Sequence, residues 1–161
     1  WLWTVQLDAL WLSVAVIVML LAVLIRIMYV IGRPRTGGMV ELALTDGTFG
    51  LYFGWVLVAA FANVFATLSA NGFTAFEDIT VGVVGIIVAA GVAIAAALLD
   101  GGRIAPALAT SWGLAWVAVA RTEGTFDAPV LTWAAAGAAV AVLVVAIARR
   151  ATIASTTRRN R

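Results

Sequence analysis

The chain has 161 residues, of which 64% are hydrophobic and 11% are charged, and its mean hydropathy is +1.09. Globular domains carry about 45–50% apolar and about 25% charged residues, so this composition excludes a soluble enzyme. The formal net charge of +2 rests on arginine alone, and in so apolar a chain it relates to membrane orientation rather than to nucleic acid.

Five apolar runs of roughly 18 to 24 residues dominate the sequence, and each is long enough to cross a hydrocarbon core about 30 Å thick. They predict an all-α fold, a polytopic transmembrane helical bundle of about five spans in a single membrane domain over residues 1–161. The spans are expected at about 9–31, 47–70, 80–99, 104–120 and 128–148. The chain begins inside what reads as the end of an apolar segment, so we expect further sequence upstream.

The first span, about 9–31, has Trp11 near one end and Tyr29 near the other, where amphipathic rings favour the level of the lipid headgroups. Arg26 lies close enough to the end of this span for its side chain to snorkel to the interface. The segment 32–46 is rich in Gly, Pro and Arg and is expected to be an aqueous loop. Whether its last part, Met39 to Leu44, joins the next helix is left open by the sequence.

The second span, about 47–70, carries a stripe of residues at spacings of three, four and seven, which is typical of one helical face. Its members are Tyr52, Trp55, Ala59, Ala62 and Asn63. The stripe could line a ligand pocket or could simply pack against another helix. An amide in hydrocarbon is costly unless it is hydrogen-bonded, so we expect Asn63 to have a partner in another helix or on a ligand.

The third span, about 80–99, has small residues at three- and four-residue intervals, which favours close packing of neighbouring helices. These residues are Gly82, Gly85, Ala89, Ala93 and Ala97. The fourth span, about 104–120, is short and has Pro106 near its start, where the missing N–H is tolerated. The fifth span, about 128–148, is followed by a polar tail, 149–161.

The distribution of arginine predicts the orientation of the bundle. The 32–46 loop, the 100–103 turn and the C-terminal tail hold 2, 1 and 5 arginines, whereas the loops on the opposite side hold only Arg121. By the positive-inside rule, the C-terminus is cytoplasmic and the loops 71–79 and 122–127 face outward.

The sequence offers little for catalysis, because it contains no Cys, no His and no Lys. Thiolate nucleophiles, imidazole bases, the usual zinc sites and Schiff bases are therefore excluded. Glu77 and Asp78 are neighbours in a loop and do not form the converging pair that acid and base catalysis needs. We expect no enzymatic activity, no metal site, no required cofactor and no nucleic-acid partner.

The run from Tyr52 to Asn63 resembles the fifth-helix motif of the translocator protein family, also called TspO/MBR or tryptophan-rich sensory proteins. The pattern of that motif is P-Y-L-x-W-x-x-F-A-x-x-L-N, and its Tyr, Trp, Ala and Asn fall in register here. Gly50 or Leu51 stands where the family has Pro, Val58 replaces its Phe and Ala62 replaces its Leu. The start of the chain, Trp1 to Trp11, resembles the end of the family's third helix and the loop that follows.

The resemblance covers residues 1–71 and leaves extra helices over 72–150, as in a longer bacterial branch of the family. It implies a helical bundle that binds a small hydrophobic, planar molecule such as a porphyrin or another tetrapyrrole, as a sensor or a carrier. The residues that it implies for ligand binding are Tyr52, Trp55, Ala59, Ala62, Asn63 and Trp3. It also implies a bacterial inner-membrane protein in contact with the lipid bilayer, and a homodimer is compatible with it.

Two other functions stay open from the sequence. A secondary transporter is suggested by a similar pattern in two parallel spans, at 54–59 and 115–120, and by the short fourth span with its proline. A structural subunit of a larger membrane complex is suggested by the small-residue faces and by the absence of acidic residues within the spans.

Overall fold

A computed structural model describes residues 2–31, 39–122 and 128–159, and the structure there is almost entirely helical with no strand. In chain order the elements are α1 (Leu2–Gln6), α2 (Leu10–Ile31), α3 (Met39–Ala70), the short 3₁₀ helix η1 (Thr74–Glu77), α4 (Ile79–Leu99), α5 (Ile104–Val119) and α6 (Pro129–Arg159). The predicted all-α bundle is confirmed. The stretch from Met39, which the sequence left open, is the first part of α3.

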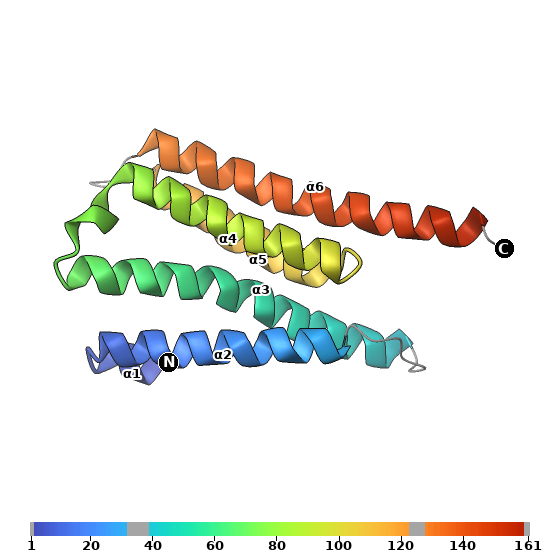
Figure 1. The fold of residues 1–161 in the computed structure, drawn as a ribbon, viewed down its shortest axis with the longest axis horizontal. Coiled ribbons are helices and arrows are strands. Elements are labelled where there is room, and N and C mark those ends of the chain that lie inside the picture. Colours follow the sequence, from blue (N-terminus) through green and yellow to red (C-terminus); the bar gives the residue numbers. More distant parts are fainter. Residues whose placement is uncertain (1, 32–38, 123–127, 160–161) are drawn as a thin grey trace.

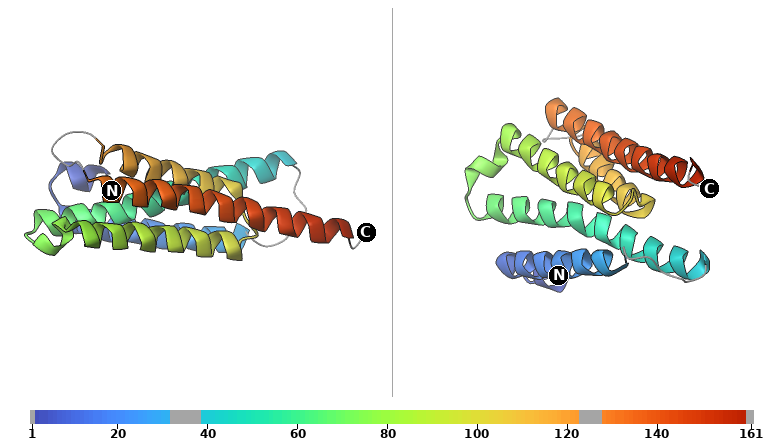
Figure 2. Two further views of the ribbon diagram at one scale, coloured as in Figure 1. Left: turned by 90° about the horizontal axis from the view of Figure 1, so that it is seen from above. Right: turned by 45° about the vertical axis from the view of Figure 1, so that its right-hand side comes forward.

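The long helices run side by side and alternate in direction along the chain (Figure 1). α2 packs on α3, α3 on α5, α5 on α6, and α6 on α4. α3 and α4 are joined through η1 but contact each other much less than these neighbouring pairs do. Figure 2 shows α2 at one edge of the bundle and α6 at the other. The bundle is therefore an open arrangement in which α3 and α5 take the central positions.

Four of the helices are long and apolar enough to cross a membrane, over Leu10–Val30, Gly47–Ala70, Ile79–Leu99 and Pro129–Thr156. They match the first, second, third and fifth predicted spans. α5 matches the fourth, but its 16 residues give a length of about 24 Å at 1.5 Å per residue. It is shorter than a hydrocarbon core of about 30 Å and is covered by α3 on one side and α6 on the other.

The last helix is longer than the predicted span. α6 continues through the predicted polar tail to Arg159, because residues 149–159 contain neither Gly nor Pro to end it. Hydroxyl groups there bond back to the helix backbone: Thr152 Oγ1 donates to Arg149 O at 2.7 Å and Ser155 Oγ donates to Thr152 O at 2.8 Å. The polar composition of residues 149–159 therefore did not mark the end of the helix.

The central pair, α3 and α5, approach closely at a glycine. A Cβ placed on Gly54 would overlap the carbonyl oxygen of Pro106 and lie 2.9 Å from the backbone nitrogen of Thr110. Thr110 Oγ1 donates to Pro106 O at 3.0 Å and lies 3.4 Å from Gly54 O, so the same contact is polar as well as close. In lipid, where apolar surfaces gain little from meeting each other, such close contact is a main source of helix association.

The end of α3 is fixed by a Schellman motif that leads the chain towards α4. The Phe73 amide donates to Leu68 O at 3.1 Å and the Gly72 amide to Ser69 O at 3.0 Å. Gly72 has φ of +82°, a conformation that glycine adopts without the steric cost of a Cβ. η1 then carries the chain to Asp78, which caps α4.

Candidate functional site

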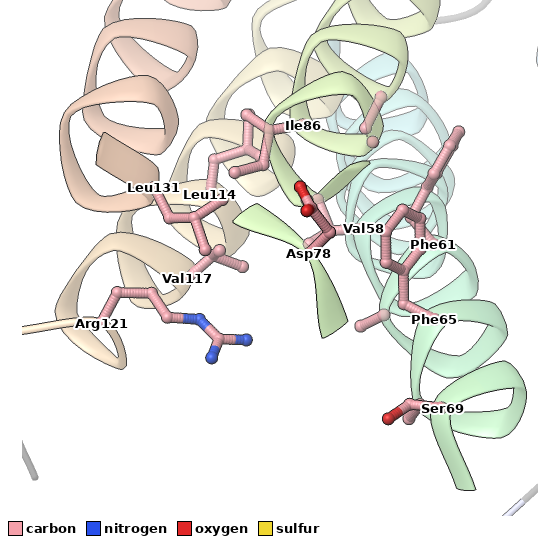
Figure 3. A pocket seen from close by; sticks show the side chains of 15 residues that line it. Val58, Phe61, Phe65, Ser69, Asp78, Ile86, Leu114, Val117, Arg121 and Leu131 are labelled. Atoms are coloured by element: carbon pink, nitrogen blue, oxygen red, sulfur yellow. The ribbon is translucent and has the colours of Figure 1, made fainter. Parts of the chain in front are cut away.

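The structure places a cavity of about 600 Å³ between α3, α4 and α5, at the end of the bundle where η1 lies (Figure 3). α3 contributes aromatic and small residues, α4 contributes small residues and Ile86, and the ends of α5 and α6 complete the wall. The lining residues are Val58, Phe61, Ala62, Phe65, Ala66, Ser69, Asp78, Gly82, Gly85, Ile86, Ala89, Leu114, Val117, Arg121 and Leu131.

The walls that α3 and α4 give to the cavity differ in the size of their side chains. Phe61 and Phe65, four residues apart, present their rings from one side of α3. Opposite them, α4 has Gly82 and Gly85, and the ring of Phe65 lies so close to Gly85 that a Cβ there would clash with it. Phe65 packs directly against Gly85 and Leu131 of α6 packs against Gly82, so these side chains give the cavity apolar walls against which a flat apolar molecule could lie.

The small-residue face of α4 was predicted to pack against other helices, and the structure confirms this for most of its length. Ala89, Ala93 and Ala97 are buried in the core of the bundle. Gly82, Gly85 and Ala89, in the first half of the helix, also line the cavity. The same stripe therefore packs against neighbouring side chains and borders the cavity in its first half, which its sequence spacing alone does not distinguish.

Of the six residues predicted to bind a ligand, Ala62 alone lines the cavity. Tyr52 and Trp55 lie on α3 with 46% and 49% of their surface exposed, and Ala59 is partly buried against the core. The exposed pair is thus on a part of α3 that faces outward from the bundle. Trp3 lies on α1 and is 77% exposed.

Asn63 has a hydrogen-bond partner on another helix, which is one of the two alternatives expected from the sequence, a partner helix or a ligand. Its Oδ1 atom lies 3.1 Å from Ser13 Oγ on α2, and Ser13 itself is fully buried and lies 2.7 Å from Leu10 O. Directly after the end of α3, Asn71 Oδ1 accepts a hydrogen bond from Trp11 Nε1 at 3.3 Å. These contacts give Asn63 a structural role between α2 and α3.

Polar side chains gather only at the outer rim of the cavity. Among its lining residues these are Ser69, Asp78 and Arg121, from the end of α3, the start of α4 and the segment after α5. Asp78 is the N-cap of α4: its Oδ1 accepts a hydrogen bond from the Thr80 amide at 2.6 Å. Hydrogen bonds from Thr80, from its side chain first and its backbone second, hold the pKa of Asp78 below its usual value of 3.8.

Sequence reasoning missed most of the cavity. Phe61, Phe65 and Leu114 read as ordinary apolar residues of a span, and only the contact of α3 with α5 brings Leu114 to the two rings. Arg121 did carry a signal, because it is the single arginine on the side of the bundle predicted to face outward. In the described part of the chain, no group of three or more His, Cys, Asp or Glu could hold a metal ion.

Comparison with known proteins gives a match to a protein family. A family model described as "TSPO-like protein" matches residues 1–148, which includes the helices beyond the region that carries the sequence resemblance. No curated protein and no solved structure matches the chain.

Proposed function

Because the chain belongs to the family of TSPO-like proteins, we propose that this integral membrane protein binds a hydrophobic, planar ligand in the cavity between α3, α4 and α5. A porphyrin or another tetrapyrrole is the ligand class, and the role is that of a sensor or carrier. The observation that carries the proposal is the apolar cavity itself. Its volume of about 600 Å³ falls within the range of roughly 300–1,000 Å³ that small-molecule sites occupy.

The lining chemistry supports a planar apolar ligand over a polar one. Phe61 and Phe65 offer aromatic surfaces for stacking, and the walls between them and α4 are apolar. The proposed role is binding without turnover, since the sequence supplies no Cys, His or Lys for covalent or general-base chemistry. We further propose that the protein resides in the inner membrane of a bacterium with its C-terminus in the cytoplasm, so that the cavity opens outward.

The test is a titration of the purified protein in detergent with protoporphyrin, followed by quenching of tryptophan fluorescence. Replacing Ala62, which lines the cavity, with Phe should fill part of the space and weaken binding at least tenfold. The matched control is Ala95→Phe, the same substitution at an exposed position of α4 outside the cavity lining, which should leave the affinity unchanged.

A third variant, Trp55→Ala, tests whether the ligand binds in the cavity or on the exposed face of α3. Trp55 does not line the cavity, so its removal should lower the total fluorescence but leave the dissociation constant within twofold of the original. Loss of binding in Trp55→Ala with retention in Ala62→Phe would move the site to the face of Tyr52 and Trp55. Absence of saturable quenching in the unmodified protein would refute the proposal.

A further inference from the structure

The polar side chains that line the cavity are all at one end, so the cavity has an apolar interior and a polar rim. Its depth is formed by Val58, Phe61, Ile86 and other apolar side chains, whereas Asp78 and Arg121 stand at the rim (Figure 3). α4 begins at Ile79 and α5 ends at Val119, so this rim lies at the level where the membrane-spanning helices end. A molecule with an apolar body and one polar end would match the cavity from its depth to its rim.

The two charged side chains at the rim offer different groups to a ligand. The Asp78 carboxylate caps α4 through Thr80, and this hydrogen bond directs it towards its own helix. Arg121 is attached to the end of α5 by its backbone amide, which donates to Ala118 O at 3.1 Å. Its guanidinium has five N–H donors in a planar fork, so it can bind a carboxylate in addition to other partners.

We propose that the cavity selects amphipathic anions, with the apolar body between α3 and α4 and the acidic group on the Arg121 guanidinium. This inference rests on the proposed function and narrows its ligand to molecules that carry a carboxylate or a comparable acid. Arginine pairs with carboxylates through two parallel hydrogen bonds, and such charge-assisted bonds are about twice as strong as neutral ones. Because Arg121 is half-buried, the acidic group should improve affinity about tenfold or more.

The proposal assigns opposite effects to the two rim charges. Loss of Arg121 removes the group that holds the anion, whereas loss of the Asp78 charge removes a neighbouring negative charge that repels it. Asn at position 78 remains a good N-cap, so Asp78→Asn changes the charge while the start of α4 is kept. No merely structural role of the rim predicts this pair of opposite changes.

The experiment compares protoporphyrin, which has two carboxylates, with its neutral dimethyl ester, using the same fluorescence titration. The unmodified protein should bind the acid at least tenfold more tightly than the ester. Arg121→Gln should abolish this preference while the affinity for the ester stays unchanged, and Asp78→Asn should increase it. The matched control, Arg26→Gln, removes one positive charge from the exposed surface of α2 and should leave the preference intact.

Equal binding of acid and ester by the unmodified protein would overturn the inference and leave the proposed function standing. An acid preference that survives Arg121→Gln would overturn it too. If neither compound binds, the proposed function itself fails.

The anion could reach the site from solution or from the bilayer, and a further arm distinguishes the two sources. The titration is repeated in nanodiscs of phosphatidylcholine with and without phosphatidylglycerol. Competition by the anionic lipid that is lost in Arg121→Gln would support the inference and identify the bilayer as a source. Unchanged affinity for the acid, with its preference over the ester retained, would support the inference with the dissolved acid as the ligand.

Discussion

Buried hydroxyl groups in this bundle differ in whether they are satisfied. Thr67 and Thr110 are each 1% exposed, on α3 and α5. Thr110 Oγ1 donates to Pro106 O, whereas Thr67 Oγ1 has no hydrogen-bond partner in the described part of the chain. A buried polar atom without a partner costs free energy, whereas a satisfied one contributes to stability.

Replacing each threonine with valine, which has nearly the same shape, should therefore have opposite effects on stability. Thr67→Val removes an unsatisfied hydroxyl and should raise the free energy of unfolding by up to about 1 kcal/mol. Thr110→Val removes a made hydrogen bond and should lower it by about 0.5–1.5 kcal/mol. Thermal unfolding of both variants in the same detergent measures the difference, and a lower melting temperature for Thr67→Val would contradict the prediction.

The turn between α4 and α5 depends on one acidic side chain. Asp100 Oδ1 accepts hydrogen bonds from the backbone amides of Gly102 and Arg103, both at 3.1 Å. Partial burial raises the pKa of Asp100 above its usual value of 3.8, against the lowering effect of its hydrogen bonds and of nearby Arg103 and Arg150. The folded state therefore binds a proton at Asp100 more tightly than the unfolded state does.

The sign of this shift gives a pH-dependent prediction. The stabilisation by a protonated Asp100 is fully present below the unfolded pKa, near 3.8, and is lost as the pH rises through the raised pKa of the folded state. Asp100→Asn keeps an oxygen acceptor without the charge, so its melting temperature should exceed that of the unmodified protein at pH 7. The gap should close as the pH falls below about 4. Asp100→Ala, which lacks the acceptor, should be less stable at both pH values.

At the scale of helices, the contact of α3 with α5 depends on the absence of a side chain at Gly54. An added Cβ would meet backbone atoms of Pro106 and Thr110, which cannot rotate away. Gly54→Ala should therefore force the helices apart and destabilise the protein by about 1–3 kcal/mol. The control is Gly137→Ala on α6, where a Cβ would meet nothing within 4 Å and the better helix propensity of Ala should hold or raise stability. Equal melting temperatures for the two variants would show that the close contact is unimportant.

The helices themselves could be predicted from the sequence, because lipid requires every backbone group of a span to be satisfied within it and so ties apolar runs to helices. A hydrogen-bond partner for Asn63 was also predictable, because an amide within a membrane span needs one. The identity of this partner, Ser13, was not predictable, because it depends on α2 lying against α3. The cavity could not be predicted for the same reason: it depends on α3 packing on α5 while separating from α4.

At the scale of the whole molecule, the distribution of arginine predicts the orientation of the bundle in the membrane. This orientation can be tested by labelling single introduced cysteines, because the chain itself contains no cysteine. A single cysteine at Ala75, exposed in η1, should react with a membrane-impermeant maleimide in intact cells. A single cysteine at Ser155, exposed near the end of α6, should react only after the membrane is opened. The reverse pattern would place the rim of the cavity in the cytoplasm and contradict the orientation.

α6 has 31 residues and is therefore about 46 Å long, whereas the hydrocarbon core is about 30 Å thick. If its first residue lies at one edge of the hydrocarbon core, its final three turns extend beyond the acyl chains as a helical stalk that bears Arg149, Arg150 and Arg159. A fluorescent protein joined to this end would be held at a defined height above the lipid rather than on a loose tether. Each residue removed from the stalk would lower that height by about 1.5 Å and turn the attachment by about 100° around the helix axis.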